Sequence, residues 1–368
     1  MARFDLAGPV ADAWDRLPRP LRWVATAALV AFFVLLPHLR IPILNTPDSD
    51  FASVLFNPIG IYVLVALGLN VVVGEAGLLD LGYVAFFAVG AYTMAVLGTK
   101  AHWPFFLILP VAIALSMLAG VVLGGPTLRL RGDYLAIVTL GFGEIVHLVA
   151  QNTNSIGGPQ GISGIPHPPN FILFGYHMQF GILDPKPYYY LLLAVIVVTI
   201  VIVRNLKRSR VGRAWTAIRE DEDAAELMGV PTFKFKLWAF AIGAGIGGTA
   251  GVMYAGKVIS ITPDNFLFNL SILFLAAVVL GGSGNLPGVI LGAIVVAYLP
   301  ERFRQFAQYR VLVFGAALVL VMIFRPQGLL PSRRRAQELL EPEPGGGMGA
   351  LGGETGLEMA PRPEAGNG

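Results

Sequence analysis

The sequence predicts an all-α polytopic membrane protein with about 8–10 transmembrane helices, some of them interrupted by glycine-rich breaks. Two observations carry this prediction. Of the 368 residues, 55% are hydrophobic and only 13% are charged, a balance that is not typical of a soluble domain. Long apolar runs also recur along the chain with polar connections between them, as expected of a chain that crosses a bilayer many times.

The composition also excludes several kinds of chemistry. The chain has no cysteine, so it offers no disulfide framework, thiolate metal site or cysteine nucleophile. The net charge is +3, and the basic residues are concentrated in loops between apolar runs. That pattern reflects membrane topology, so we expect no nucleic-acid partner.

The chain begins with a segment, residues 1–22, that we expect to be cytoplasmic. Four arginines precede the first apolar run: Arg3, Arg16, Arg19 and Arg22. Positive residues next to a span favour the cytoplasmic side. The segment is too long and too mixed for a signal peptide, and no small-residue cleavage site follows the apolar run.

A transmembrane domain is expected over residues 23–331. Its apolar runs lie at 23–36, 55–73, 83–97, 103–125, 134–150, 188–203, 237–255, 270–280, 289–299 and 311–324. The runs after 270 are short, and the segment GGSGNLPG (281–288) separates two of them. Broken segments of this kind often line a transport pathway. GGSGNLPG resembles GEAGLLDLG (74–82), which is either an internal repeat or a chance likeness.

The number of spans near residue 300 stays open. If 270–280 and 289–299 both cross the membrane, Arg302, Arg304 and Arg310 lie outside, against the positive-inside rule. Either this turn is an exception or the stretch does not cross twice. Beyond the last run, Arg325 and the arginines at 333–335 place the C-terminus inside, and the Gly-, Pro- and Glu-rich tail, 332–368, is expected to be disordered.

Two long loops are predicted on opposite sides. The loop 151–187 is rich in Gly, Pro and Asn and has one Lys or Arg, Lys186, so we expect it in the periplasm. The loop 204–236 holds eight Lys or Arg and is expected in the cytoplasm. Within it, 214–228 lacks Pro and Gly and is predicted to form one helix about 22 Å long, which Gly229 ends.

Glycine patterns in the apolar run 237–255 look like nucleotide-binding signatures. The segment from Gly251 to Lys257 matches most of a phosphate-binding loop, but Val258 stands where Ser or Thr must reach magnesium. A GxGxxG pattern from Gly243 lacks the preceding strand. We interpret the four-residue spacing of Gly243, Gly247, Gly251 and Ala255 as a small-residue face for close helix packing.

Glu144 is a carboxylate within the predicted span 134–150. Together with Gly141 and Gly143 it resembles the GxGD motif of intramembrane proteases, but the nearest second acid, Asp133, lies about 16 Å away along a helix. With His147 it forms at most half of a carboxylate-bridged metal site. We expect neither an enzyme nor a metal site. Glu144 is predicted to line a pathway or gate, and the alternative is a protonated or paired structural carboxyl.

Several stretches together resemble one family. Asp223-Ala224-Ala225-x-x-x-Gly229 is similar to the EAA-x-x-x-G loop of ABC-importer permeases, with Asp223 in place of the leading Glu. The longer stretches are LRGDYLAIVTLGFGEIVHL (130–148), GGPQGISGIP (157–166), AIREDEDAAELMG (217–229), VVLGGSGNLPGVILGA (278–293) and RPQGLLP (325–331). They resemble the M-type permease subunit of the Liv branched-chain amino-acid ABC importers, over most of residues 50–331.

The resemblance implies a multi-pass subunit of the bacterial inner membrane, surrounded by lipid and with both termini in the cytoplasm. It implies an H-type homologous permease, two cytoplasmic ABC ATPase subunits and a periplasmic amino-acid-binding protein as partners, and no cofactor in this chain. The implied function is import of branched-chain or related hydrophobic amino acids by ATP-driven alternating access. Urea, short amides or sugars as cargo, and an ion-coupled secondary transporter that uses Glu144, remain as alternatives.

The predicted site residues form three groups. Coupling to the ATPase is assigned to Arg219, Glu220, Asp221, Glu222, Asp223, Ala224, Ala225 and Gly229. The translocation pathway or gate is assigned to Gly141, Gly143, Glu144, His147, Gly281, Gly282, Gly284 and Asn285. Docking of the binding protein is assigned to Asn152, Asn154, Gly157, Gly158 and Gln160.

Overall fold

The computed structural model describes residues 33–38, 51–129, 132–173, 176–181, 184–302, 315–316, 319 and 328–330. All of them belong to one compact unit, Met1–Ser332. The predicted N-terminal segment 1–22 and tail 332–368 lie outside the described residues, as do Arg304, Arg310 and most of the predicted spans 23–36 and 311–324.

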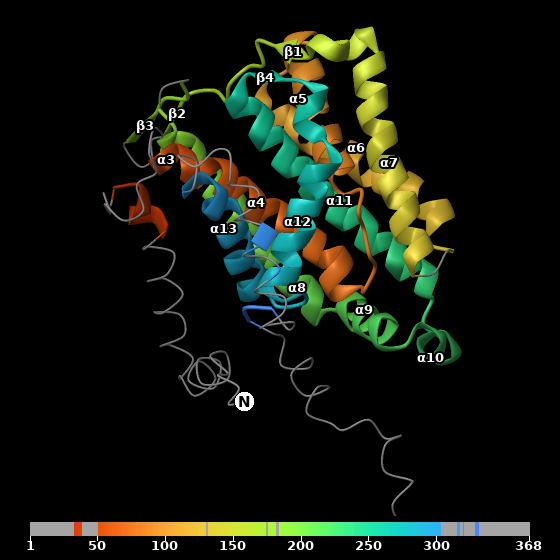
Figure 1. The fold of residues 1–368 in the computed structure, drawn as a ribbon. Helices are drawn as coiled ribbons and strands as arrows, with labels where there is room; N and C mark the ends of the chain where they lie inside the picture. The colour runs from red at the N-terminus through yellow and green to blue at the C-terminus, as the bar shows by residue number, and fades with distance from the viewer. Residues whose placement is uncertain are drawn as a thin grey trace, which may run out of the picture. The chain divides into compact units, whose positions relative to one another are not determined.

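Helices dominate the described part of the chain (Figure 1). The helical segments are η1 (Leu36–His38), α3 (Phe51–Val54), η2 (Leu55–Gly60), α4 (Ile61–Leu69), η3 (Asn70–Glu75), α5 (Val84–Thr99), α6 (Phe105–Thr127), α7 (Asp133–Asn152), η4 (Asn154–Ile156), η5 (Gly158–Gln160), α8 (Lys186–Arg208), α9 (Arg210–Glu220), α10 (Glu222–Leu227), α11 (Thr232–Val258), η6 (Pro263–Phe266), α12 (Phe268–Gly281) and α13 (Leu286–Arg302). Two short antiparallel strand pairs, which the sequence did not predict, join β1 (Ile162–Ser163) to β4 (Ser260–Ile261) and β2 (Phe171–Leu173) to β3 (Tyr176–Met178).

Among the described residues, six helical segments are long and apolar enough to cross a membrane. They are Phe51–Glu75, Phe105–Thr127, Tyr134–Asn152, Lys186–Arg208, Thr232–Val258 and Pro263–Gly281. The shorter apolar helix α5 and helix α13 pack among them. The prediction of an all-α polytopic membrane protein is confirmed.

Helix α11 lies in the middle of the bundle and packs against α4, α5 and α6 (Figure 1). Its glycines allow this close approach. A Cβ atom on Gly243 would lie 2.5 Å from Val72, and one on Gly251 would overlap the backbone of Phe87 in α5. Tyr83 fills the space beside Gly247 and donates a hydrogen bond of 2.6 Å to the Gly243 carbonyl. The predicted small-residue packing face is confirmed, and the nucleotide-binding patterns lie inside this membrane helix.

Helices α12 and α13 form an antiparallel hairpin. Gly281 faces Gly288, and further along Gly292 faces Ala277, at separations that leave no room for a Cβ on either Gly281 or Gly292. The chain therefore runs down α12, turns at 282–285 and returns along α13. Arg302 lies at the far end of α13 from the turn, whereas Arg304 and Arg310 lie outside the described residues, so the number of membrane crossings around residue 300 stays a prediction.

The prediction of one continuous helix over 214–228 is wrong, because the structure has two helices there, α9 and α10. Helix α9 ends at Glu220, and Asp221 adopts an extended conformation (φ −156°, ψ 112°) before α10 begins. The Asp221 carboxylate accepts a hydrogen bond of 3.0 Å from the Ala224 amide. A short polar side chain that can cap a new helix competes with continuation of the old one.

Candidate coupling junction and outer cavity

The polar loop between α8 and α11 is tied to the ends of the spanning helices. Lys207, in the last turn of α8, donates hydrogen bonds of 2.7 Å to the Glu75 carboxylate and 2.7 Å to the Gly284 carbonyl. The Glu75 side chain is only 7% exposed, whereas that of Lys207 is 43% exposed. A nearly buried carboxylate needs such a cationic partner, so the pair with Lys207 stabilises Glu75 inside the protein.

Arg219 of α9 contacts the same two glycine-rich segments as Lys207. Its guanidinium donates to the Gly74 carbonyl, and its side chain covers Gly77 and Gly284. A Cβ atom at Gly77 would lie 2.8 Å from Arg219 Cγ, and one at Gly284 would lie 2.7 Å from Arg219 Nη1. Both glycines also have positive φ, +73° and +84°, a conformation that L side chains rarely adopt. Glycine at these positions therefore lets Arg219 lie against the backbone.

The two glycine-rich breaks meet directly. The Gly284 amide donates a hydrogen bond of 2.8 Å to the Asn70 side-chain oxygen, which joins the end of the first long helix to the α12–α13 turn. Glu75, Asn70, Lys207, Arg219 and Gly284 thus form one cluster, which we call the coupling junction. The sequence pointed to the likeness between the two breaks but not to their contact.

A segment near the C-terminus lies against the same turn. The amides of Leu329 and Leu330 donate to the carbonyls of Leu280 (2.7 Å) and Gly281 (3.1 Å). Asn285 donates from its side chain to the Leu330 carbonyl at 2.9 Å. Of the predicted pathway residues, Gly281, Gly282, Gly284 and Asn285 therefore lie at or beside the coupling junction.

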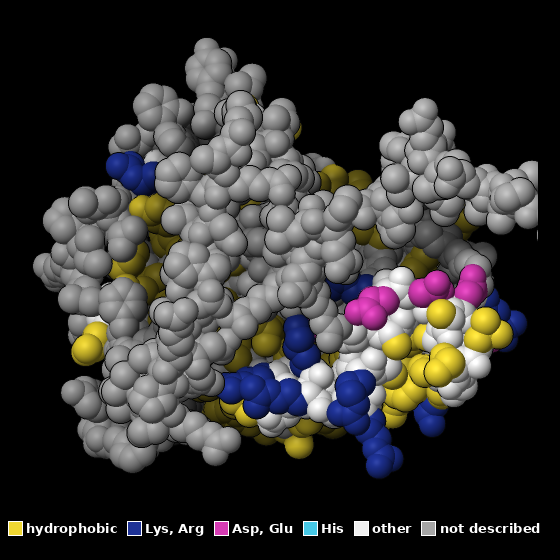
Figure 2. Space-filling view, turned by 90° about the horizontal axis from the view of Figure 1, so that it is seen from below, with side chains coloured by type: hydrophobic (Ala, Val, Ile, Leu, Met, Phe, Trp, Pro, Cys, Tyr) yellow, Lys and Arg dark blue, Asp and Glu magenta, His cyan; other side chains and the backbone are white. Residues whose placement is uncertain are grey.

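Helix α10 projects from the lower end of the bundle (Figure 1). Ala225 is buried, whereas Ala224 is exposed and the next two large apolar side chains, Leu227 and Met228, are 89% and 85% exposed. Seen from below, hydrophobic and acidic side chains lie side by side at this edge (Figure 2). The sequence gives no signal for the exposure of Leu227 and Met228, because an apolar side chain at the end of a helix cannot be told from a core residue in sequence.

Two contacts hold the loop on α11. The Trp215 indole nitrogen donates a hydrogen bond of 2.7 Å to the Phe235 carbonyl, and Glu222 pairs with Lys236, whose side chain is 3% exposed. The remaining predicted coupling residues, Glu220, Asp223 and Gly229, are exposed on α9, on α10 and just after α10. The predicted coupling residues therefore fall into two sets: some, such as Arg219, face the bundle, and the others face outward.

Asp80 lies in the connection between η3 and α5 and is fully buried. Its Oδ1 accepts a hydrogen bond of 2.9 Å from the Gly82 amide, and its Oδ2 has no hydrogen-bond partner among the described residues. Burial raises the pKa of Asp80 to about 7, because the charged form loses its hydration.

The other predicted pathway residues lie on α7, apart from the junction. His147 is buried, and its Nδ1 lies 3.1 Å from the Pro263 carbonyl. Gly143 faces Gly82, at 3.3 Å from its ideal Cβ to the Gly82 Cα. Gly141 and Glu144 are turned away from the bundle: nothing lies within 4 Å of a Cβ built on Gly141, and Glu144 is exposed.

The predicted docking residues form one turn at the opposite end of the molecule from α10 (Figure 1). Asn152 closes α7 with a side-chain hydrogen bond of 2.8 Å to the Leu148 carbonyl. Gly157 and Gly158 have positive φ values of +99° and +53°, so the turn requires them. Asn154 and Gln160 are exposed there, and β1 follows immediately and pairs with β4.

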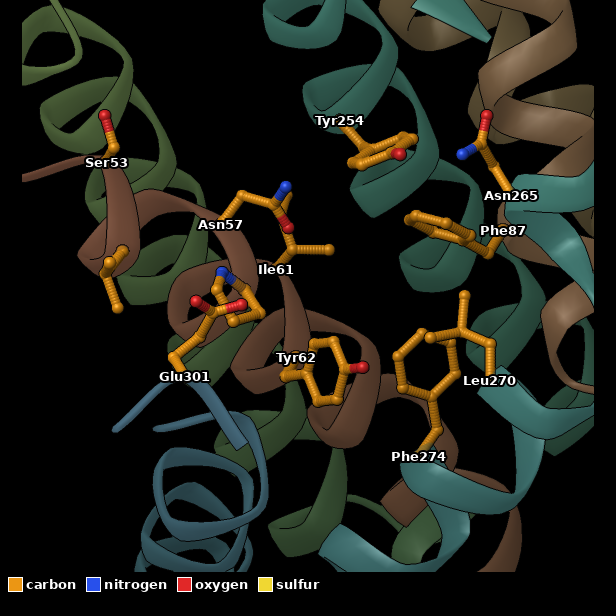
Figure 3. Close-up of a pocket in the computed structure, with 12 residues that line it drawn as sticks. Ser53, Asn57, Ile61, Tyr62, Phe87, Tyr254, Asn265, Leu270, Phe274 and Glu301 are labelled. Carbon is orange, nitrogen blue, oxygen red and sulfur yellow. The ribbon is translucent and has the colours of Figure 1, made fainter. Parts of the chain in front are cut away.

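A cavity of about 440 Å³ opens near this end (Figure 3). It is lined by Ser53, Val54, Asn57, Pro58, Ile61, Tyr62, Phe87, Tyr254, Asn265, Leu270, Phe274 and Glu301. Asn57, Ile61 and Tyr62 lie on one side, and Phe87, Tyr254 and Phe274 face them from the other. The aromatic rings contact one another, with centroids 5.4 Å apart for Phe87 and Tyr254. None of the predicted pathway residues lines this cavity.

A helical membrane bundle with an open, aromatic-lined cavity toward one end and a projecting polar loop fixed at the other fits a membrane transport subunit. The model of the family "Branched-chain amino acid transport system / permease component" matches residues 52–322. The chain belongs to this family.

Named relatives agree with this membership. The chain is 45% identical over 294 residues to the "High-affinity branched-chain amino acid transport system permease protein LivM" of Escherichia coli strain K12 and 44% identical to its Salmonella typhimurium counterpart, covering 74% of this chain and 68% of each relative. It is 31% identical over 127 residues to the Salmonella typhimurium permease protein LivH, covering 34% of this chain and 41% of that protein. No solved structure matches the chain.

Proposed function

We propose that this chain is the M-type permease subunit of an ATP-driven importer of branched-chain amino acids. The observation that carries the proposal is the arrangement of the loop 204–236. The same loop offers an exposed docking helix, α10, and grips the glycine-rich ends of the spanning helices through Lys207 and Arg219. A loop built in this way can pass a movement from a soluble partner to the membrane helices.

The partner at α10 is proposed to be a cytoplasmic ABC ATPase. Ala224 has a small side chain that allows close approach, and Leu227 and Met228 supply apolar side chains that are almost fully exposed in this chain. Large apolar side chains at such exposure indicate an interaction surface. On this proposal the loop, the N-terminal segment and the tail 332–368 are cytoplasmic, and 151–187 faces the periplasm, where an amino-acid-binding protein docks.

The coupling junction then acts as the joint. If α9 moves with the ATPase, Arg219 carries Gly74 with it, and Lys207 carries Glu75 and Gly284. The first long helix and α12 both start near the cavity and end at the junction: Asn57 and Phe274 line the cavity, whereas Gly74 and Gly281 lie at the junction end. Movement of the junction therefore reaches both walls of the cavity, as alternating access requires.

The cavity is proposed as the outer part of the route for the amino acid. Its volume lies within the range of small-molecule sites. The aromatic wall suits an apolar side chain, and aromatic faces also attract an ammonium group. Asn57 and Asn265 provide amide groups for a carboxylate, and the described lining contains one carboxylate, Glu301, and no Lys or Arg. This lining favours amino acids over urea or sugars as cargo.

The competing proposal is an ion-coupled transporter that uses Glu144 as its proton carrier. Reconstitution decides between the two. The tagged chain is co-expressed with its neighbouring transporter subunits, purified in mild detergent and reconstituted with the binding protein. We expect a second permease and ATPases to co-purify, and leucine uptake to require ATP inside the vesicles when no ion gradient is present. Uptake driven by a proton gradient without ATP would overturn the proposal.

Ala224→Glu tests the docking surface. Because Ala224 is exposed and Ala225 is buried, a charge at 224 blocks docking without disturbing the packing of α10, whereas Ala225→Glu also disturbs the loop itself. The expected result is an inserted, folded permease that no longer retains the ATPase. Glu226→Lys, an exposed change on the same helix that removes no small side chain, is the matched control for altered charge.

A further inference from the structure

Helix α7 carries a carboxylate on a face that no described part of the chain covers. Glu144 is exposed and lies about 15 Å along the helix from Tyr134, near the middle of the candidate span Tyr134–Asn152. The exposed large side chains along the same helix are Tyr134, Ile137, Val138, Ile145, Leu148 and Val149.

Gly141 lies at the centre of this exposed face. No atom of the described residues is within 4 Å of a Cβ built there, so the small size of Gly141 serves no packing within the described part of the chain. In membranes, a small residue on a helix surface allows a second helix to approach closely. Gly143, by contrast, faces Gly82 and belongs to the bundle.

Lipid does not suit this face. A carboxyl group at mid-depth is costly against hydrocarbon whether it is charged or protonated and unpaired. The exposed mid-span side chains of α6 and α8, such as Leu118, Val122, Val198 and Val201, are by contrast all apolar, as a surface that faces lipid requires.

We propose that this face of α7, formed by Tyr134, Ile137, Gly141, Glu144, Ile145 and Leu148, binds a homologous permease subunit of a different sequence. That subunit places a hydrogen-bond donor or a cation opposite Glu144. The inference rests on the proposed function, which supplies such a subunit, and it goes beyond it by locating the interface and its central polar contact.

The charge on Glu144 argues for a different subunit over a second copy. Two copies that meet on this face about a two-fold axis bring two Glu144 carboxyl groups toward each other, and two neighbouring carboxylates cannot both ionise without cost. A related subunit keeps the helix arrangement and is free to differ at this position. A relative of this kind is available, since LivH aligns with 127 residues of this chain at 31% identity.

The first test is site-specific photo-crosslinking in the purified complex that contains a tagged H-type permease. A photoreactive amino acid replaces Ile145 on α7 or, as matched control, Val201 on α8, both of which are half-exposed apolar side chains. We expect at least tenfold more adduct with the tagged permease from position 145 than from position 201. An equal yield from both positions, or an adduct between two copies of this chain, overturns the inference.

The two levels of failure are distinguishable. A complex that contains the H-type permease but gives no adduct at position 145 refutes the α7 interface and leaves the proposed function intact. A preparation without any H-type permease removes the basis of both.

The second test compares Glu144→Gln with Glu144→Leu. Glutamine keeps an acceptor for the partner's donor, whereas leucine removes it and suits lipid better. We expect the leucine variant to retain about tenfold less of the H-type permease through purification, with the glutamine variant close to the unmodified chain. Equal or greater retention by the leucine variant shows that the face is turned to lipid and refutes the inference.

Discussion

Removal of the Arg219 side chain should uncouple the ATPase from the membrane helices while leaving both in place. Arg219 is partly buried, donates a charge-assisted hydrogen bond to the Gly74 carbonyl and covers Gly77. A hydrogen bond to a charged group contributes about 1.5–3 kcal/mol. Taking about 2 kcal/mol for this partly exposed bond, Arg219→Ala shifts the equilibrium between a seated and a displaced α9 by about 30-fold.

The assay is leucine uptake by proteoliposomes that contain the whole transporter at saturating ATP. Uptake should fall by up to about 30-fold, while insertion and ATPase co-purification stay unchanged, because the exposed face of α10 is intact. Arg213→Ala is the matched control: Arg213 is an exposed arginine of the same helix and donates to the Arg208 carbonyl within its own loop. If Arg219→Ala transports as well as Arg213→Ala, the junction does not transmit the ATPase movement.

Three further outcomes are expected. Asp221→Ala removes the N-cap of α10, costs about 1 kcal/mol of local stability and weakens retention of the ATPase in a pull-down, whereas Asp221→Asn keeps the cap. Equal loss of ATPase retention in both variants would show that the negative charge of Asp221, and not its capping hydrogen bond, matters. Asp80 has a raised pKa of about 7, so between about pH 4 and pH 7 the folded chain holds a proton that the unfolded chain, with its ordinary pKa of 3.8, releases. The free energy of unfolding therefore falls as the pH rises through this range. Asp80→Asn should remove this pH dependence and raise the melting temperature at pH 8, and an unchanged pH profile would refute the raised pKa of Asp80. Ser53→Cys introduces a cysteine into the cavity of a chain that has no other cysteine, and it should make uptake sensitive to a membrane-impermeant thiol reagent, with protection by leucine. The control Leu267→Cys, at an exposed position near the same end, should be labelled without loss of uptake. If uptake by the Ser53→Cys variant is insensitive to the reagent, the cavity is not on the transport route.

Local patterns in the sequence were sufficient to predict most of the helices. Within the described residues, the predicted apolar runs between 55 and 299 appear as helices within a few residues of their predicted limits. The spacing of Gly243, Gly247 and Gly251 identified the packing face of α11, because helix periodicity is a property of neighbouring residues. Motif likeness also identified the family. The break between α9 and α10 was missed because Asp221 has a helix-compatible neighbourhood, and only its side-chain hydrogen bond to Ala224 shows that it is a cap.

The sites needed the tertiary structure. The likeness of the segments near Gly74 and Gly284 was visible in the sequence, but their contact through Asn70 joins residues more than 200 positions apart, and nothing local encodes that contact. The same is true of the cavity, whose walls come from eight helical segments. It is also true of Lys207, which in the sequence is one of eight loop cations and in the structure pairs with Glu75. The sequence alone determined which segments are helical and apolar, because those properties depend on nearby residues. The tertiary structure decided which side chains meet and which face outward, because burial and contact depend on how the helices pack against one another.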